Sequence, residues 1–321
     1  MRRGNDRCYG KGLCVIIRNF TADDVLRGYT ADKAMISSFF EGTLNYEVLY
    51  GQNSIVELEN LSHAELDRSL NKIHDILASG SYDRFFLFIL SHGNAKGILT
   101  NEPGSKVNME MGREYTVDQV VAKFNHVNLP NMRGYPKCIF VQACRGRDIP
   151  QVAADEEVNS IQETAQQRQA RTPTVAQRDL QETELTRMAN GGDILVCYPS
   201  EAGHFSFLTA QGSFLILEVI QAIKKYHREE HLMDILVEAT FAVGQTIYNK
   251  EFRSGPNQEV ETHEVSQMPH IVSTMTKKFY LYINQTDRCE KREHFKNFST
   301  TLFSTGYMSN RYTVHVNNCR L

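Results

Sequence analysis

The sequence predicts an α/β fold in which a sheet of about six mostly parallel strands has helices on both faces. Short, continuous apolar runs alternate along the chain with longer segments whose apolar residues recur at helical spacing. Continuous apolar runs are typical of strands that are buried on both faces, and their alternation with helices favours a parallel sheet. Two of these runs end in reactive side chains, His92 and Cys144, at the edge where a parallel sheet usually carries its site.

The elements follow one another in this alternating order. Strands are expected at residues 12–17, 46–50, 85–90, 138–141, 193–198 and 271–273, and a further apolar run at 278–283 closes the domain. Helices are expected at residues 32–44, 61–79, 116–124, 213–227 and 231–249. Ser62 and Glu65 form a capping box at the start of the second helix, and Thr30 or Ala31-Asp32 is expected to cap the first. The polar residues 18–30 are expected to be loop.

Composition changes abruptly after Ile149. Residues 150–192 contain no aromatic residue and are dominated by Gln, Glu, Thr and Ala. Such a stretch cannot bury enough apolar surface to offset its ordering entropy, which predicts a disordered linker. The chain is therefore expected to consist of a larger part at 1–149, the linker at 150–192, a smaller part at 193–283 and a C-terminal extension of unknown role at 284–321.

Composition and charge exclude several classes of function. The 321 residues are 41% hydrophobic and 23% charged, as in ordinary soluble globular proteins, and the net charge of -3 gives no argument for nucleic acid or an anionic membrane. No apolar run approaches the roughly 18 residues of a membrane span. The seven cysteines include no Cys-x-x-Cys pair, so neither metal nor cofactor is expected. The odd number of cysteines favours a reducing, cytoplasmic location, which keeps Cys144 a free thiol.

The strongest motif is the string Gln-Ala-Cys-Arg-Gly at residues 142–146, with Ser91-His92-Gly93 about 50 residues upstream. A cysteine thiolate is a strong nucleophile, and a histidine within reach can take its proton and later protonate a leaving amine. The pair predicts a Cys/His nucleophilic enzyme. The string and its upstream histidine resemble those of the caspases, cysteine proteases that cut proteins after aspartate.

This resemblance covers roughly residues 12–283 and implies further roles. The backbone N–H groups of Gly93 and Cys144 would form the oxyanion hole, and the backbone carbonyl of Val25 would orient His92. The linker occupies the place where the family is cleaved during maturation. Its candidate processing sites are Asp155 and Asp179, but Glu156 and Leu180 follow them where a small residue is normal. Self-processing is therefore expected to be slow, or to be done by another protease.

The substrate pocket departs from the family pattern. The family binds aspartate with two arginines and a glutamine, and here Arg27 matches the first arginine and Gln142 the glutamine, while Leu208 stands at the place of the second arginine. Removing one partner of a buried charge costs about 2–5 kcal/mol, or tens- to thousands-fold in binding or turnover. The resemblance places the other pocket residues at Phe205, Ser206, Phe207 and Phe214.

Three readings follow from this pocket. The chain is an active or weakly active caspase that cuts protein substrates after aspartate as a dimer, in programmed cell death or a related signalling pathway. Alternatively, it is a decoy with a defective pocket that pairs with an active caspase and regulates it. In the third reading Leu208 helps to admit an apolar residue, although Arg27 and Gln142 argue against this because they would be costly to bury unpaired. The resemblance places the dimer-forming edge at residues 268–273.

Overall fold

The computed structural model describes residues 11–22, 27–51, 56–80, 82–103, 112–148, 191–254 and 259–281. Val25, Asp155, Asp179 and the extension at 284–321 lie outside these ranges, so the expectations placed on them are not addressed by the structure.

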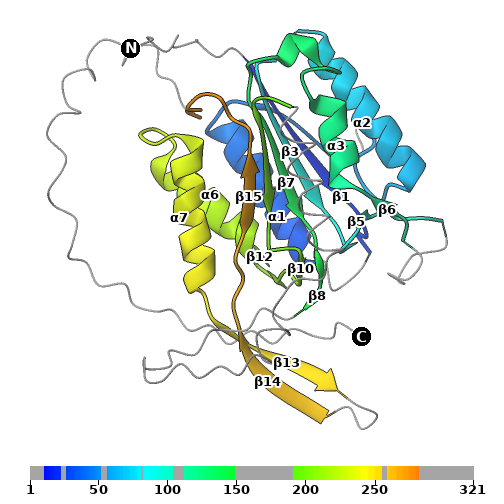
Figure 1. The fold of residues 1–321 in the computed structure, drawn as a ribbon, viewed down its shortest axis with the longest axis vertical. Helices are drawn as coiled ribbons and strands as arrows, with labels where there is room; N and C mark the ends of the chain where they lie inside the picture. Colours follow the sequence, from blue (N-terminus) through cyan, green and yellow to red (C-terminus); the bar gives the residue numbers. More distant parts are fainter. Residues whose placement is uncertain are drawn as a thin grey trace, which may run out of the picture.

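The centre of the molecule is a six-stranded sheet, as predicted (Figure 1). Its order is β15 (His270–Ser273), β9 (Ile194–Tyr198), β7 (Lys137–Gln142), β3 (Arg84–Leu90), β1 (Gly12–Arg18) and β2 (Glu47–Tyr50). Every neighbouring pair is parallel except β15 with β9, which is antiparallel. Strands that precede and follow the predicted linker therefore share one sheet, and β7 and β9 are the pair that joins them.

Helices cover both faces of the sheet (Figure 1). One face packs against α2 (His63–Ala78) and α3 (Val117–Phe124), and the other against α1 (Gly28–Gly42), α6 (Phe214–Tyr226) and α7 (Leu232–Gln245). Alternate residues of a strand point to opposite faces. In β1, accordingly, Leu13 and Val15 join the cluster under α2, and Cys14 and Ile16 join the cluster under α1. The continuous apolar runs arise from this two-sided burial.

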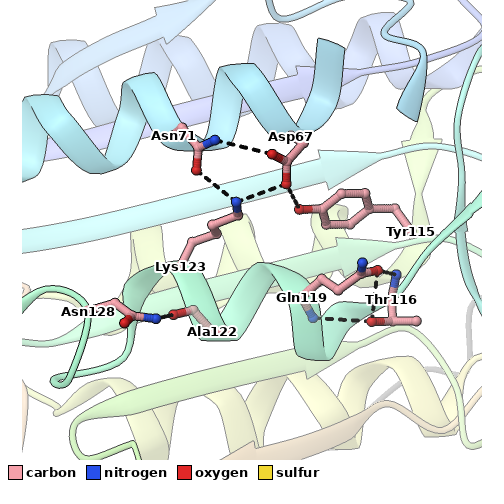
Figure 2. Close-up of polar contacts among 8 residues, drawn as sticks. All are labelled: Asp67, Asn71, Tyr115, Thr116, Gln119, Ala122, Lys123 and Asn128. Atoms are coloured by element: carbon pink, nitrogen blue, oxygen red, sulfur yellow. Dashed lines mark hydrogen bonds and ion pairs between the residues drawn. The ribbon is translucent and has the colours of Figure 1, made fainter. Parts of the chain in front are cut away.

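Polar side chains cap the N-terminus of α2 and connect α2 to α3. The predicted capping box of α2 is present, and the Ser62 backbone N–H donates to the Glu65 carboxylate at 2.9 Å. Figure 2 shows how α3 is tied to α2: the Lys123 ammonium lies 2.8 Å from the Asp67 carboxylate and donates to Asn71 at 2.7 Å. Tyr115 donates to the same Asp67 carboxylate at 2.8 Å. These contacts lower the pKa of Asp67, the Lys123 hydrogen bond contributing most.

Four small sheets and a short 3-10 helix (Pro130–Met132) complete the described fold. Three of the sheets surround the carboxyl ends of the central strands: β4 (Gly93–Asn94) with β5 (Gly97–Leu99) and β6 (Glu114–Tyr115), β8 (Gly146–Asp148) with β10 (Gly203–His204), and β11 (Leu208–Thr209) with β12 (Gly212–Ser213). The fourth is the hairpin of β13 (Tyr248–Ser254) and β14 (Glu259–Val265), which projects beyond α7 (Figure 1).

Three predicted boundaries are wrong. Helix α1 begins at Gly28, inside the predicted loop, and its N-cap is Arg27, so neither Thr30 nor Asp32 caps it. The helix predicted to reach residue 249 ends at Gln245, and the apolar Ile247, whose spacing favoured a longer helix, is 41% exposed and directly precedes β13. In the closing run, residues 278–281 form no strand; Tyr280 makes only an isolated bridge to His231.

Candidate active site

The two reactive side chains lie next to each other because their strands do. Strands β3 and β7 are adjacent and parallel with Leu90 opposite Gln142, so residues two positions further on leave the sheet at the same height. Those residues are His92 and Cys144. A Cβ added at Gly93 would lie 2.5 Å from the Cys144 carbonyl oxygen and 2.8 Å from the Cβ of Ala143. The backbones that carry the histidine and the cysteine are therefore in direct contact, and only glycine permits it.

His92 is fixed by its surroundings. Its side chain is buried and its ring meets Phe20 edge to face, with 5.0 Å between ring centroids. Its backbone carbonyl accepts the N–H of Leu99 at 2.9 Å, while the neighbouring Ser91 hydroxyl donates to the Leu99 carbonyl at 2.8 Å. Strand β5 thus holds the chain on both sides of the ring.

The thiol of Cys144 faces Ser206 on the segment between β10 and β11. The Ser206 backbone N–H donates to the sulfur at 3.5 Å, and the Ser206 hydroxyl oxygen lies 3.6 Å from it. The Gln142 side-chain amide donates to the same hydroxyl at 3.4 Å. The segment between β10 and β11 therefore contacts both Cys144, the predicted nucleophile, and Gln142, the predicted pocket glutamine.

The residues predicted to form the first subsite come from three parts of the chain, and among them Arg27 is exposed while Gln142 is buried. Gly28 packs directly on the Thr209 carbonyl, and a Cβ added there would lie 2.8 Å from Cδ1 of Leu208. Since Arg27 precedes Gly28, this contact brings the predicted arginine and Leu208 into one neighbourhood, although they are 181 positions apart in the sequence. Gln142 is fully buried, and its side-chain oxygen has no hydrogen-bond partner among the described residues.

Aromatic side chains lie along the same segment. Phe207 is buried against Val265, and Phe214 packs against this pair. The Phe207 backbone N–H donates to the side-chain oxygen of the fully buried Gln267 at 2.8 Å, which anchors the segment to the chain that enters β15. Phe205 is half-buried next to Ser206.

Two supporting contacts had no signal in the sequence. The Tyr29 hydroxyl, from α1, donates to the carbonyls of Ser91 at 3.1 Å and Gln142 at 3.0 Å, and so ties together the ends of β3 and β7. Nothing in the local pattern distinguishes this tyrosine from an ordinary core residue. The second contact is made by Arg145, which belongs to the motif at residues 142–146 but for which the sequence predicts no role.

Arg145 joins the motif to the sheet edge. Its guanidinium lies 3.9 Å from the ring centroid of Tyr198 and donates to the Ser200 carbonyl and to Nδ1 of His270, each at 3.3 Å. Burial, and next the charge of Arg145, lower the pKa of His270. The residue after the nucleophile is therefore fixed against both β9 and β15.

Neither a metal centre nor a membrane span is found in the described part of the chain. No three His, Cys, Asp or Glu side chains in these ranges are grouped so that they could hold a metal ion. None of the described helices has the length and apolarity needed to cross a bilayer. The four described cysteines, Cys14, Cys138, Cys144 and Cys197, are free thiols.

The six-stranded sheet that carries His92 and Cys144 at the ends of adjacent strands can be compared with known proteins. The model of the family described as "Caspase domain" matches residues 11–280. The chain belongs to the caspase family. This family is one of cysteine peptidases, and the motif at residues 142–146 lies within the matched region.

Individual caspases resemble this chain over most of its length. Cell death protein 3 of Caenorhabditis remanei is 26% identical over 289 residues, which cover 87% of this chain and 51% of that protein. Caspase-2 of Gallus gallus is 22% identical over 280 residues, or 85% of this chain and 58% of that protein. The chain thus spans about half the length of the curated caspases it matches. The crystal structure of Caspase-1 from Spodoptera frugiperda has the same fold, with a TM-score of 0.62, 17% identity, and coverage of 89% of this chain and 97% of that one.

Proposed function

We propose that this caspase is an endopeptidase that cleaves proteins after aspartate, in programmed cell death or a related signalling pathway. The observation that carries the proposal is the placement of His92 and Cys144 at the ends of adjacent parallel strands, with Gly93 packed on Cys144. The similarity to a relative named Cell death protein 3 supports the pathway.

The chemistry of the proposed reaction follows from the residues at these two strand ends. His92 takes the thiol proton, and the Cys144 sulfur attacks the carbonyl carbon of the scissile peptide bond. The oxyanion that forms accepts hydrogen bonds from the backbone N–H groups of Gly93 and Cys144. The C–N bond breaks as His92 protonates the leaving amine, which leaves a thioester on Cys144. Water, deprotonated by His92, then hydrolyses the thioester and restores the thiol.

Recognition of the substrate aspartate is assigned to Arg27 and Gln142, with Ser206, Phe205, Phe207 and Phe214 along the substrate backbone and side chains. The support is that Gln142 contacts Ser206, and that Gly28 places Arg27 beside the start of β11. The buried, unpaired oxygen of Gln142 marks a polar position that a substrate or water can satisfy. The backbone carbonyl of Val25 is proposed to orient the His92 ring.

Maturation and assembly are proposed from the family pattern. The larger part at 1–149 and the smaller part at 193–283 would separate by cleavage of the zymogen after Asp155 and Asp179. Strand β15 lies at the edge of the central sheet, and no described strand pairs with its outer side, so we propose that this side pairs with a second chain, either a copy of this one or another caspase. The free thiols support a reducing, cytoplasmic setting.

The test compares the purified chain with Cys144→Ala, at high protein concentration, on peptides that end in aspartate or in leucine. Cleavage after aspartate that depends on Cys144 supports the proposal. Preference for leucine would instead mean that Leu208 has converted the pocket to an apolar one. Cleavage that persists in Cys144→Ala would reject the assigned nucleophile.

A second candidate function is that of a decoy that pairs with an active caspase and regulates it. The observation that favours it is the packing of Leu208 on Gly28, at the position where the family carries its second arginine. Loss of one partner to a buried carboxylate costs about 2–5 kcal/mol, which lowers binding or turnover tens- to thousands-fold. No cleavage by the chain alone, together with altered activity of an added caspase, supports this candidate.

The variant Leu208→Arg tests the pocket directly, with Leu208→Met as a control that keeps an apolar side chain of similar volume. We expect Leu208→Arg to raise cleavage after aspartate by tens-fold or more, since each 1.4 kcal/mol changes the rate by about tenfold. Leu208→Met should leave it within a few-fold. Equal activity in the two variants would show that the missing arginine is not the defect.

A further inference from the structure

A short hairpin, residues 208–213, is formed by β11 and β12 and contains Leu208; we call it the β11–β12 turn. It packs on a buried carboxyl group. Asp32 lies in the first turns of α1 and is 0% exposed. Its Oδ1 accepts the backbone N–H of Ser213 at 2.9 Å, across 181 positions of sequence. Ser213 is the N-cap of α6, so a side chain of α1 holds the point where β12 turns into the next helix.

The fit between the carboxyl group and the turn is tight. Gly212 has a φ of +125°, a conformation that favours glycine, and a Cβ added there would collide with Oδ1 of Asp32 and lie 3.0 Å from Cε of Met35. One helical turn earlier, Gly28 packs on Thr209 and Leu208. Close contacts at Gly28 and at Asp32, on one face of α1, therefore hold β11 and β12, respectively, against the helix.

The second carboxyl oxygen of Asp32 makes the packing of the turn on α1 depend on protonation. Oδ2 is buried and has no hydrogen-bond partner among the described residues. A buried carboxylate with one unsatisfied oxygen is costly when ionised and tolerated when protonated. Opening the turn away from α1 would return the group to water.

We propose that Asp32 is a proton-controlled positioning residue, which keeps the β11–β12 turn seated on α1 while it is protonated and loosens it when ionised. Among the described residues its side chain is hydrogen-bonded to neither Cys144 nor His92, and it acts through the turn that carries Leu208. The consequence for substrate binding rests on the proposed function, whereas the movement of the turn does not.

The charges around Asp32 agree with this assignment. Burial raises its pKa from the usual 3.8 to about 7, and the hydrogen bonds from Ser213 oppose the rise. The charged groups on the elements packed against it are Arg27, Lys33 and Glu41 on α1 and Glu218, Lys224 and Lys225 on α6. The Lys33 ammonium is directed to Glu59, at 3.9 Å, and to the ring of Tyr50. Burial, and not a neighbouring charge, is the cause of the shift.

The sign of the pH effect follows from linkage. Asp32 has its ordinary pKa of about 4 when the turn is open and a raised pKa when the turn is seated. At a pH between these two values, Asp32 is protonated in the seated form and ionised in the open form. Opening then releases one proton, so the opening constant rises about tenfold per pH unit across this window and levels off above it.

Hydrogen exchange of the Ser213 amide, measured from about pH 5 to about pH 8 and expressed as a protection factor, tests the proposal without requiring activity. In the wild-type chain we expect protection at Ser213 to fall by at least tenfold, while amides of β3 and β7 keep theirs. Asp32→Asn retains the acceptor but not the titration, so its protection at Ser213 should be independent of pH. Asp75→Asn, at a carboxylate that is 79% exposed on α2, serves as the matched control and should behave as wild type.

Two results would overturn the proposal: a flat profile at Ser213 in the wild-type chain, or a fall shared equally by β3 and β7, which would report global unfolding. Because the wild-type profile is decisive by itself, the test does not depend on whether Asp32→Asn folds. An inactive chain with the expected profile would reject the proposed function and leave the role of Asp32 in place.

Discussion

The contact between Gly93 and Cys144 yields the sharpest prediction, which concerns Gly93→Ala. The added methyl group would lie 2.5 Å from the Cys144 carbonyl oxygen, 2.8 Å from the Cβ of Ala143 and 3.1 Å from the Gly97 carbonyl oxygen. Two of these three atoms belong to backbone, which cannot rotate away as a flexible side chain can. The two strand ends must therefore move apart.

The size of the effect can be estimated from these distances. Ordinary contacts of a Cβ begin at about 3.4 Å, so the nearest atom must move by roughly 1 Å. A misplacement of about 1 Å between catalytic groups costs on the order of 100-fold in rate. The central sheet pairs its strands before Gly93, so secondary structure should survive and the loss should appear in kcat.

The assay is cleavage of a peptide that ends in aspartate, together with the rate at which iodoacetamide alkylates Cys144, followed by peptide mapping. The alkylation rate reports the thiol even if turnover is slow. Gly42→Ala is the matched control, because a Cβ at Gly42 meets nothing within 4 Å. It should retain activity and gain up to about 1 kcal/mol of stability, since alanine favours the helix.

Circular dichroism decides whether a loss is local. If Gly93→Ala keeps its activity and alkylation rate within about threefold of Gly42→Ala, the inference that this glycine sets the distance between the catalytic groups is wrong. Loss of activity accompanied by loss of folded signal would also contradict it, since the expected effect is confined to the site.

Two further predictions concern stability, measured by urea unfolding. Tyr29→Phe removes the donor shared by the Ser91 and Gln142 carbonyls, and should lower the free energy of unfolding by about 1–3 kcal/mol; a change below about 0.5 kcal/mol would contradict this. Lys137 is fully buried, and burial lowers its pKa to about 8, below the usual 10.5. The folded state binds fewer protons than the unfolded state between these values, so wild-type stability should rise with pH there, a rise that Lys137→Met should lack. A constant difference between the two proteins from about pH 7 to about pH 10 would refute it.

The sequence predicted the central sheet well because burial on both faces leaves a local mark. Short apolar runs indicated the strands of that sheet except β2, which was predicted from the alternation at residues 46–50, and the capping box at Ser62 indicated the start of α2. Boundaries failed where the local pattern was ambiguous. Ile247 extends the apolar spacing of α7 although it is exposed and belongs to the turn toward β13.

In the candidate site, too, local motifs can be recognised in the sequence, whereas contacts between distant residues cannot. The motif around Cys144 and the tripeptide around His92 are local strings, and their spacing and preceding strands are visible in the sequence. The role of Asp32 was misread, because its position near a helix start resembles a cap. Its partner is the Ser213 backbone, which no pattern within α1 indicates.

By itself, the sequence determined the fold class, and its motifs predicted Cys144 as the nucleophile, His92 as its partner and Leu208 at the place of a second arginine, because each depends on residue types in one element or on a motif. Only the tertiary structure decided that Gly28 packs on Leu208, that Tyr29 ties the ends of β3 and β7 together, and that Asp32 is buried under the β11–β12 turn. These contacts join α1 to segments up to 181 positions away. Periodicity describes one face of one element, whereas the neighbour that covers that face is chosen by the packing of the whole chain.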